Sequence, residues 1–331
     1  MSVEATAPAK IILFGEHSVV YKGPAIVLAI DRRASVVASK RDDKRIYIDA
    51  EDLGFSGCFE NGEYIAITGK AWRGRNMTAL YAASRKVMSH IGIDSGINLK
   101  VRSEIPIAVG LGSSAAVCVA TTAAVGELFD SDLSKEKIAE LSFEGEKVIH
   151  GNPSGVDNNI ATFGGIMRYE RGVGLEHLRL DKPLPFIIGN TRKKRSTGNM
   201  VESVRALRER NPEIVDPIIY TMASLSQVGL DALFRGDTRK LGDLMNLNHG
   251  LLSALGVSTI ELDDLVYAAR SEGALGAKLT GAGGGGCIIA LAEVENLSRV
   301  EKGIRAARGQ SIRVNITDEG VKTRRLLVGD P

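Results

Sequence analysis

The sequence predicts a mixed α+β protein of two domains. Its 331 residues are enough for about two domains of roughly 150 residues each. Short apolar runs alternate along the whole chain with segments whose apolar residues recur at helical spacing, which is typical of mixed α and β structure. Pro183 and Pro185 mark a change between the two halves. We therefore expect one domain over residues 1–183 and another over residues 184–331.

The first half is predicted to combine strands with long helices. The apolar run after Lys10 predicts a strand that this lysine opens. In residues 77–91, apolar side chains recur every three or four positions between Asn76, which can cap a helix, and Gly92, which can end one. The remaining predicted elements of this half are a strand over 97–101 and helices over 113–128 and 135–150, the last capped by Ser134.

The second half is predicted to begin with a strand and to end with four more. Asp216 and Pro217 have the chemistry of a helix start, because aspartate can cap free N–H groups and proline lacks an N–H that the first turn leaves unpaired. We therefore expect a helix from there towards Phe234. The other predicted elements are a strand over 184–189, helices over 197–210, 238–254 and 258–271, and strands over 276–280, 286–291, 311–316 and 321–327.

Composition and charge exclude several classes of protein. Lys and Arg number 42 against 40 Asp and Glu, so we expect no nucleic-acid partner, since such partners are bound through a basic surface. The sequence has neither a long uncharged apolar run nor a secretory leader, which predicts a cytoplasmic protein with no membrane partner. Its three cysteines are far apart and it has no His-Glu-x-x-His motif, which argues against a disulfide framework and a zinc hydrolase.

Glycine is the residue type in excess, with 37 of 331 residues. Residues 281–286 contain five glycines between two predicted strands. A dinucleotide-binding fingerprint needs a helix after its glycines, so we interpret this segment as a flexible hairpin. We favour contact of its backbone with a ligand over a plain turn, because ordering so much glycine is costly.

A second glycine-rich segment precedes the helix predicted over 113–128. Gly110, Gly112, Ser113 and Ser114 would present backbone N–H groups and hydroxyls at a helix N-terminus, which is chemistry that binds phosphate. The segment lacks the Gly-Lys-Ser/Thr of a Walker A loop. A closely packed helix start with a serine cap explains the same residues equally well.

Three other segments supply charged candidates. A turn rich in Gly, Asn and Pro over 151–155 would aim Asp157, although a helix-capping aspartate is the simpler interpretation. Glu144 and Glu146 precede it on a predicted helix, and at that spacing only one of them can face the same site. Lys10 is either a solvated charge at a strand end or a cation for a ligand.

In chain order, residues 10–21, 106–116 and 278–286 resemble the three motifs of the GHMP small-molecule kinases, a family that includes galactokinases and homoserine kinases. Within the family, residues 15–21 and 150–158 resemble the branch that phosphorylates mevalonate, whereas galactokinases continue the Glu-His pair differently. The resemblance implies an N-terminal domain like ribosomal protein S5 domain 2 and a ferredoxin-like C-terminal domain.

The resemblance also implies roles for individual residues. Asp157 would be the catalytic base, with Lys10 beside it and the acceptor hydroxyl. Ser114 and Glu146 would hold Mg²⁺, which selects Glu146 over Glu144. The residues expected around the ATP phosphates are Gly110, Leu111, Gly112, Ser113, Ser114, Ala115 and Ala116. Those expected near mevalonate are Lys10, Glu16, His17, Asp157, Thr197, Gly281 and Ala282, with Arg192 and Ser196 as further candidates for its carboxylate.

The expected function is therefore ATP-dependent phosphorylation of the primary hydroxyl of mevalonate to 5-phosphomevalonate, a step towards isoprenoid precursors, with ATP and Mg²⁺ as cofactors. Another kinase of the family, such as one acting on phosphomevalonate, is an alternative, because residues 192–195 are basic and could hold a second phosphate. A non-catalytic nucleotide-binding protein on the same fold is another. The sequence leaves open the formation of a homodimer and the contacts to adenine.

Overall fold

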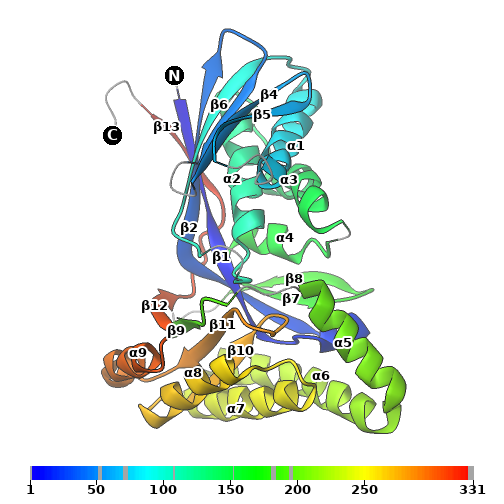
Figure 1. Cartoon of the computed structure of the whole chain (residues 1–331), viewed down its shortest axis with the longest axis vertical. Coiled ribbons are helices and arrows are strands. Elements are labelled where there is room, and N and C mark those ends of the chain that lie inside the picture. Colours follow the sequence, from blue (N-terminus) through cyan, green and yellow to red (C-terminus); the bar gives the residue numbers. More distant parts are fainter. Residues whose placement is uncertain are drawn as a thin grey trace.

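The computed structural model describes residues 2–50, 54–69, 74–106, 109–151, 153–179, 184–193 and 197–326. Within these ranges the strands form two sheets, so the predicted α+β class is confirmed (Figure 1). The larger sheet contains β1 (Ser2–Phe14), β2 (Ala25–Arg41), β3 (Ile46–Ala50), β4 (Phe55–Glu60), β5 (Glu63–Thr68), β6 (Gly96–Ser103), β7 (Ile166–Glu170), β8 (Gly174–Leu178) and β13 (Lys322–Leu326). The smaller sheet contains β9 (Pro185–Asn190), β10 (Gly276–Thr280), β11 (Cys287–Leu291) and β12 (Gln310–Asn315).

The strand order of each sheet determines the positions of β1 and β10, two strands that border the candidate site described below. The larger sheet runs β13-β1-β2-β6-β3-β4-β5, with β7 beside the first part of β2 and β8 beside β7. Its described pairs are antiparallel except β3 with β6. The smaller sheet is antiparallel in the order β10-β11-β9-β12, which leaves β10 at its edge.

Helices form one layer against each sheet. In Figure 1 the first group lies along one side of the larger sheet and most of the second group lies below the smaller sheet. The first group contains α1 (Gly74–Ile91), α2 (Ser113–Leu128), α3 (Lys135–His150) and α4 (Val156–Phe163). The second contains α5 (Thr197–Arg210), α6 (Pro212–Arg235), α7 (Thr238–Ala254), α8 (Ile260–Ser271) and α9 (Leu297–Ala306), and short 3₁₀ turns occupy Ser18–Tyr21 and Val294–Asn296.

Helix α2 is buried along almost its whole length, which explains its small residues. It packs on β1 and β2 and is covered by α1, α3 and α4. Alanine and other short side chains let neighbouring elements approach closely from several directions. The same core continues along β1, where Ile11, Leu13 and Phe14 are fully buried.

Several predicted elements have the bounds that the sequence indicated. Those over 113–128, 135–150, 197–210, 238–254 and 276–280 match α2, α3, α5, α7 and β10. Ser134 caps α3 as predicted, because its hydroxyl accepts a hydrogen bond from the Lys137 N–H at 3.3 Å. The start of α1 differs: the helix begins at Gly74, so Asn76 lies within its first turn.

The predicted start of α6 is wrong. The helix begins at Pro212, which occupies the first helical position, and it continues through Pro217. The apolar face formed by Val215, Ile219 and Met222 is buried across that point, so packing holds the turn in which proline removes a hydrogen bond. Asp216 is not a cap, because its carboxylate binds the guanidinium of Arg208.

The chain returns to the larger sheet at its end. Strand β13 pairs antiparallel with β1, from Lys322 opposite Thr6 to Leu326 opposite Ser2, a connection that the sequence did not indicate. The boundary expected between residues 183 and 184 falls where the chain passes from the larger sheet to the smaller one. Residues 180–183 lie outside the described residues, and the boundary stays a prediction.

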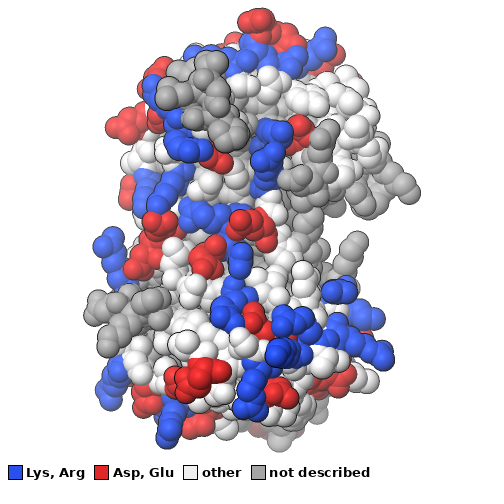
Figure 2. All heavy atoms as spheres, turned by 90° about the vertical axis from the view of Figure 1, so that its left-hand side faces the viewer, with Lys and Arg blue, Asp and Glu red and all other residues white. Residues whose placement is uncertain are grey.

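The surface mixes charges of both signs. Figure 2 shows one face on which Lys and Arg atoms alternate with those of Asp and Glu. Charges of opposite sign also pair on the described part of the chain, for example Arg325 with Asp130 at 2.7 Å and Arg313 with Glu301 at 2.7 Å. None of the helices in the described ranges combines the length and the apolar character that crossing a bilayer requires.

Candidate active site between the two sheets

The centre of the candidate site is an ion pair between Lys10 and Asp157. Their Nζ and Oδ1 atoms are 3.2 Å apart. Lys10 lies inside β1 and is buried, so the prediction that it opens a strand is wrong. Asp157 belongs to the first turn of α4, and its side chain is 34% exposed. The lysine is therefore held by the protein, while the carboxylate is accessible to a ligand.

The glycine segment before α2 lies directly against Lys10. The Lys10 N–H donates to the backbone oxygen of Leu111 at 2.9 Å. Gly112 has φ of 75°, and a Cβ atom at this position would lie 2.8 Å from Cγ of Lys10. Glycine is therefore required here on grounds of both backbone conformation and space. The segment also brings the N-terminus of α2, with its free N–H groups, to the same place.

Ser114 and Glu146 meet beside this pair. The Ser114 hydroxyl donates to Oε1 of Glu146 at 2.9 Å, which joins α2 to α3. Glu144 faces elsewhere and binds Lys147 at 3.0 Å. Of the two glutamates that the sequence offered, the structure therefore brings Glu146 to the site.

The surroundings of Glu146 disfavour its ionised form. Burial raises the pKa of this carboxyl to about 7, and the charge of Asp157 adds to the effect, while the Ser114 hydroxyl and Lys10 oppose it. Among the described residues, no three His, Cys, Asp or Glu side chains group together as a metal site. One hydroxyl and one carboxylate suit Mg²⁺, which usually takes one or two protein carboxylates and completes its shell with water and substrate phosphates.

A second group of predicted residues lies where β1 meets the smaller sheet. The His17 ring donates from Nε2 to the backbone oxygen of Ala282 at 2.9 Å. This oxygen can only accept, so Nε2 carries a proton. Strands β10 and β11 pair antiparallel up to Thr280 opposite Cys287, which confirms the hairpin predicted for residues 281–286. The turn after β1 and the tip of this hairpin are therefore in contact.

Glu16, in the same turn, is enclosed by the protein. Its carboxylate binds the ammonium of Lys278, and both side chains have 0% exposure. Burial raises the pKa of Glu16 and lowers that of Lys278, and each charge opposes the shift of the other. Lys278 was not among the residues predicted for the site. A lysine between Ala277 and Leu279 in an apolar strand indicates that its ammonium is buried against a charged partner. The sequence does not identify that partner.

The predicted residues near α5 are less closely connected. Thr197 is the first residue of α5 and is exposed, and its side chain makes no hydrogen bond or ion pair with another described residue. The helix does reach the hairpin, because a Cβ atom on Gly284 would lie 2.7 Å from Sδ of Met200. Arg192 is exposed in the preceding segment. Ser196 lies outside the described residues, as do Ile107 and Ala108 of the segment before α2.

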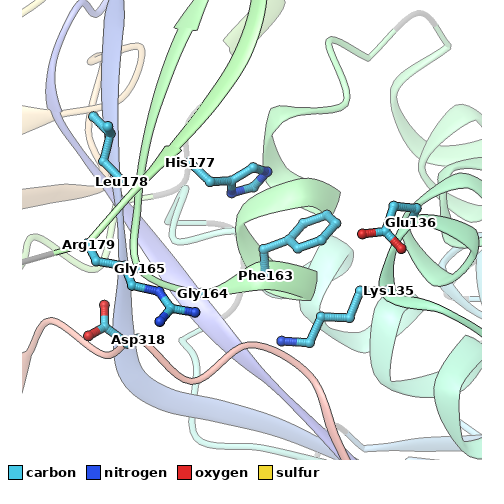
Figure 3. Close-up of a pocket in the computed structure, with 9 residues that line it drawn as sticks. All are labelled: Lys135, Glu136, Phe163, Gly164, Gly165, His177, Leu178, Arg179 and Asp318. Atoms are coloured by element: carbon cyan, nitrogen blue, oxygen red, sulfur yellow. The ribbon is translucent and has the colours of Figure 1, made fainter.

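A separate pocket of about 310 Å³ lies between α3, α4 and β8 (Figure 3). The His177 ring packs against Phe163, with centroids 4.4 Å apart, and burial lowers the pKa of His177. Lys135 and Arg179 extend into the same space from different elements. Because none of the predicted site residues lines this pocket, we do not place the reaction there.

Comparison with known proteins identifies the family of this chain. The model of the GHMP kinases N terminal domain matches residues 78–165, and that of the GHMP kinases C terminal matches residues 230–311. Mevalonate kinase of Thermococcus sibiricus is 42% identical over 330 residues, which cover 97% of this chain and 98% of that protein.

Solved structures of low sequence identity share the whole fold. The crystal structure of L. major mevalonate kinase in complex with R-mevalonate has a TM-score of 0.81 and 27% identity, and the match covers 95% of this chain and 96% of that one. Methanococcus jannaschii mevalonate kinase gives a TM-score of 0.80 at 27% identity, over 96% and 98% of the two chains. The chain therefore belongs to the GHMP kinase family, and within it to the mevalonate kinase group.

Proposed function

We propose that this chain transfers the γ-phosphoryl group of ATP to the primary hydroxyl of mevalonate, giving 5-phosphomevalonate and ADP. The observation that carries the proposal is the ion pair between Lys10 and Asp157 at the N-terminus of α2, with Nζ and Oδ1 3.2 Å apart. The relatives named above are called mevalonate kinases, and the L. major structure holds R-mevalonate. Membership of a kinase family implies the use of ATP.

Asp157 acts as the base in this proposal. Its partly exposed carboxylate accepts the proton of the acceptor hydroxyl as the O–P bond forms, which typically contributes about 10²- to 10⁴-fold to the rate. The ammonium of Lys10 lies beside it and stabilises the charge that develops on the acceptor oxygen. Phosphoryl transfer needs little covalent chemistry from the protein, so the placement of these two groups accounts for most of their effect.

The segment from Gly110 to Ala116 binds the phosphates of ATP in this proposal. Backbone N–H groups at the N-terminus of α2 donate to phosphate oxygens. Ser114 and Glu146 would hold Mg²⁺, which when bound offsets the negative charge of the β- and γ-phosphates. The hydrogen bond of 2.9 Å between the Ser114 hydroxyl and Glu146 supports this assignment, because it brings two oxygen ligands from different helices together.

In this proposal the acceptor lies between Asp157 and the place where His17 meets Ala282 of the hairpin. Gly281, Ala282 and Thr197 are assigned to its remaining contacts, because the hairpin and α5 also meet there. The carboxylate of mevalonate needs a cation or hydrogen-bond donors. His17 and the exposed Arg192 are the candidates among the described residues.

A substrate panel tests the proposal. The purified chain is incubated with ATP and Mg²⁺, and ADP release is measured with mevalonate, 5-phosphomevalonate, galactose or homoserine as the acceptor. We expect release to depend on mevalonate. Preference for 5-phosphomevalonate would instead favour the second kinase considered above, and nucleotide binding with no turnover on any acceptor would favour a non-catalytic protein.

A further inference from the structure

Lys278 has no exposed surface, although it carries an ammonium group in the middle of β10. The ammonium donates to the carboxylate of Glu16 and, at 2.7 Å, to the backbone oxygen of Leu279. The carboxylate is equally enclosed, and its Oε2 atom has no hydrogen-bond partner among the described residues. Each of the two charges therefore depends mainly on the other for compensation.

Stability alone does not explain this pair. Well-packed apolar residues in place of a buried ion pair often leave a protein equally stable or more stable, whereas loss of one partner leaves an unpaired buried charge. The neighbours Ala277 and Leu279 are apolar and buried, so an apolar residue would suit this strand. Because loss of either partner is costly, the pair is better explained by a role in holding together the two segments that carry Glu16 and Lys278.

Within the described residues, the pair is one of several contacts that connect β1 and the turn after it to the edge of the smaller sheet. Three of them use Lys278, Thr280 and Ala282, which are alternate residues, and alternate residues of an extended chain face the same side. These contacts are Lys278 with Glu16, Thr280 with Ile12, and Ala282 with His17. In the second contact, the threonine hydroxyl accepts from the N–H at 3.0 Å and donates to the carbonyl at 2.8 Å.

His249, from α7, supports β10 independently. The Leu279 N–H donates to its Nδ1 atom at 3.4 Å, and its Nε2 atom lies 3.1 Å from Oδ1 of Asp263. Because Nδ1 accepts, the proton of the neutral ring is on Nε2. Burial lowers the pKa of His249 to about 4, so near neutral pH the ring adds no second positive charge near Lys278.

We propose that Lys278 is a positioning residue: through Glu16 it holds the turn that carries His17 in register with the hairpin 281–286. The two sides of the acceptor site come from different sheets, and this pair fixes one against the other. Glu16 then acts by binding Lys278 and makes no contact with the acceptor. The inference rests on the proposed function, because it concerns the site assigned to mevalonate.

The position of the pair predicts which kinetic constant changes. The phosphate segment is attached to Lys10 and α2, and within the described residues no hydrogen bond or ion pair joins Lys278 to either of them. Loss of the ammonium should therefore affect the binding of the acceptor much more than that of the nucleotide. A displacement of about 1 Å at a reacting centre can cost about 10²-fold in rate.

The experiment compares Lys278→Met, Glu16→Gln, the double variant and the control Lys302→Met, an exposed lysine on α9. Mevalonate-dependent ADP release gives KM and kcat, titration with a non-hydrolysable ATP analogue gives the nucleotide Kd, and hydrogen exchange reports on residues 12–18 and 280–286. We expect Lys278→Met to lower kcat/KM by about 10²-fold, mainly through KM. The nucleotide Kd should stay within about twofold, and Lys302→Met should behave as the wild type.

The double variant distinguishes positioning from direct contact. It contains no unpaired buried charge, so we expect it to regain at least about tenfold in kcat/KM over Lys278→Met. If Lys278→Met does not fold, the same comparison is made between the double variant and Glu16→Gln. A double variant that is no better than the single variant, or a Lys278→Met protein with unchanged KM, would overturn the inference.

Failure of the proposed function gives a different result. If the wild type releases no ADP with mevalonate, the proposed function fails, and hydrogen exchange still tests the positioning role. In that case we expect faster exchange of the turn and the hairpin in Lys278→Met than in Lys302→Met. Equal exchange in the two variants would contradict the role of the pair.

Discussion

Replacing Gly112 with alanine tests the contact between the phosphate segment and Lys10. The new Cβ atom would lie 2.8 Å from Cγ of the lysine, whereas carbon atoms in contact are normally about 3.5–4.0 Å apart. The lysine side chain must therefore withdraw by about 1 Å. Its Nζ atom is 3.2 Å from Asp157, so this movement disturbs the pair proposed to act on the acceptor.

Gly92 offers a matched control. It has φ of 71°, close to the 75° of Gly112, but a Cβ atom there would have nothing within 4 Å. Both substitutions place alanine in the left-handed region, at a cost of about 1–2 kcal/mol in the free energy of unfolding. Only Gly112→Ala also displaces Lys10, and a misplacement of about 1 Å can cost about 10²-fold. That factor corresponds to about 2.7 kcal/mol in transition-state stabilisation.

The assay combines denaturant unfolding with mevalonate-dependent ADP release. We expect similar losses of stability in both variants, but a fall of about 10²-fold in kcat/KM for Gly112→Ala alone. If Gly112→Ala kept the kcat/KM of Gly92→Ala, the contact with Lys10 would have no bearing on the reaction, and the argument from the geometry of this segment would be refuted.

Two further predictions concern stability. Thr280→Val removes both hydrogen bonds to Ile12 and should lower the free energy of unfolding by about 2 kcal/mol or more. The control Thr221→Val lies on an exposed helix face and should change this free energy by less than about 0.5 kcal/mol. Denaturant titrations measure both values. The pKa of His249 falls from 6.5 to about 4 on folding. Between these pH values the unfolded chain therefore binds more protons than the folded one. The free energy of unfolding should fall by about 3 kcal/mol as the pH drops from 6.5 to about 4. Melting curves of His249→Gln should show a correspondingly shallower dependence, and the slope of the wild type would contradict the assignment.

Local signals in the sequence predicted the helices best. The helix predicted over 135–150 with a cap at Ser134 has the bounds observed for α3. The start of α6 could not be predicted in the same way, because the residues next to Pro217 indicate that this proline lies in the first turn of a helix. Its place inside the helix depends on packing of Val215 and Ile219 with distant parts of the chain.

Contacts between distant residues were predicted only in part. The resemblance to the GHMP kinases put Lys10 beside Asp157, and the structure brings the two side chains together. Lys278 was missed because its partner Glu16 lies 262 positions away in the chain. A buried lysine indicates that a charged partner lies beside it. The partner is Glu16 only because the folded chain places the turn after β1 against the edge of the smaller sheet.

The turnover of Asp157→Asn tests the central claim most directly. At saturating mevalonate and Mg²⁺-ATP, we expect kcat to fall by at least about 10²-fold, with the Kd of an ATP analogue within about twofold of the wild type, because the phosphates are assigned to the segment before α2. Asp231→Asn, at an exposed aspartate of α6, should keep the wild-type kcat. Turnover of Asp157→Asn close to that of the wild type would contradict the role of Asp157 as the base.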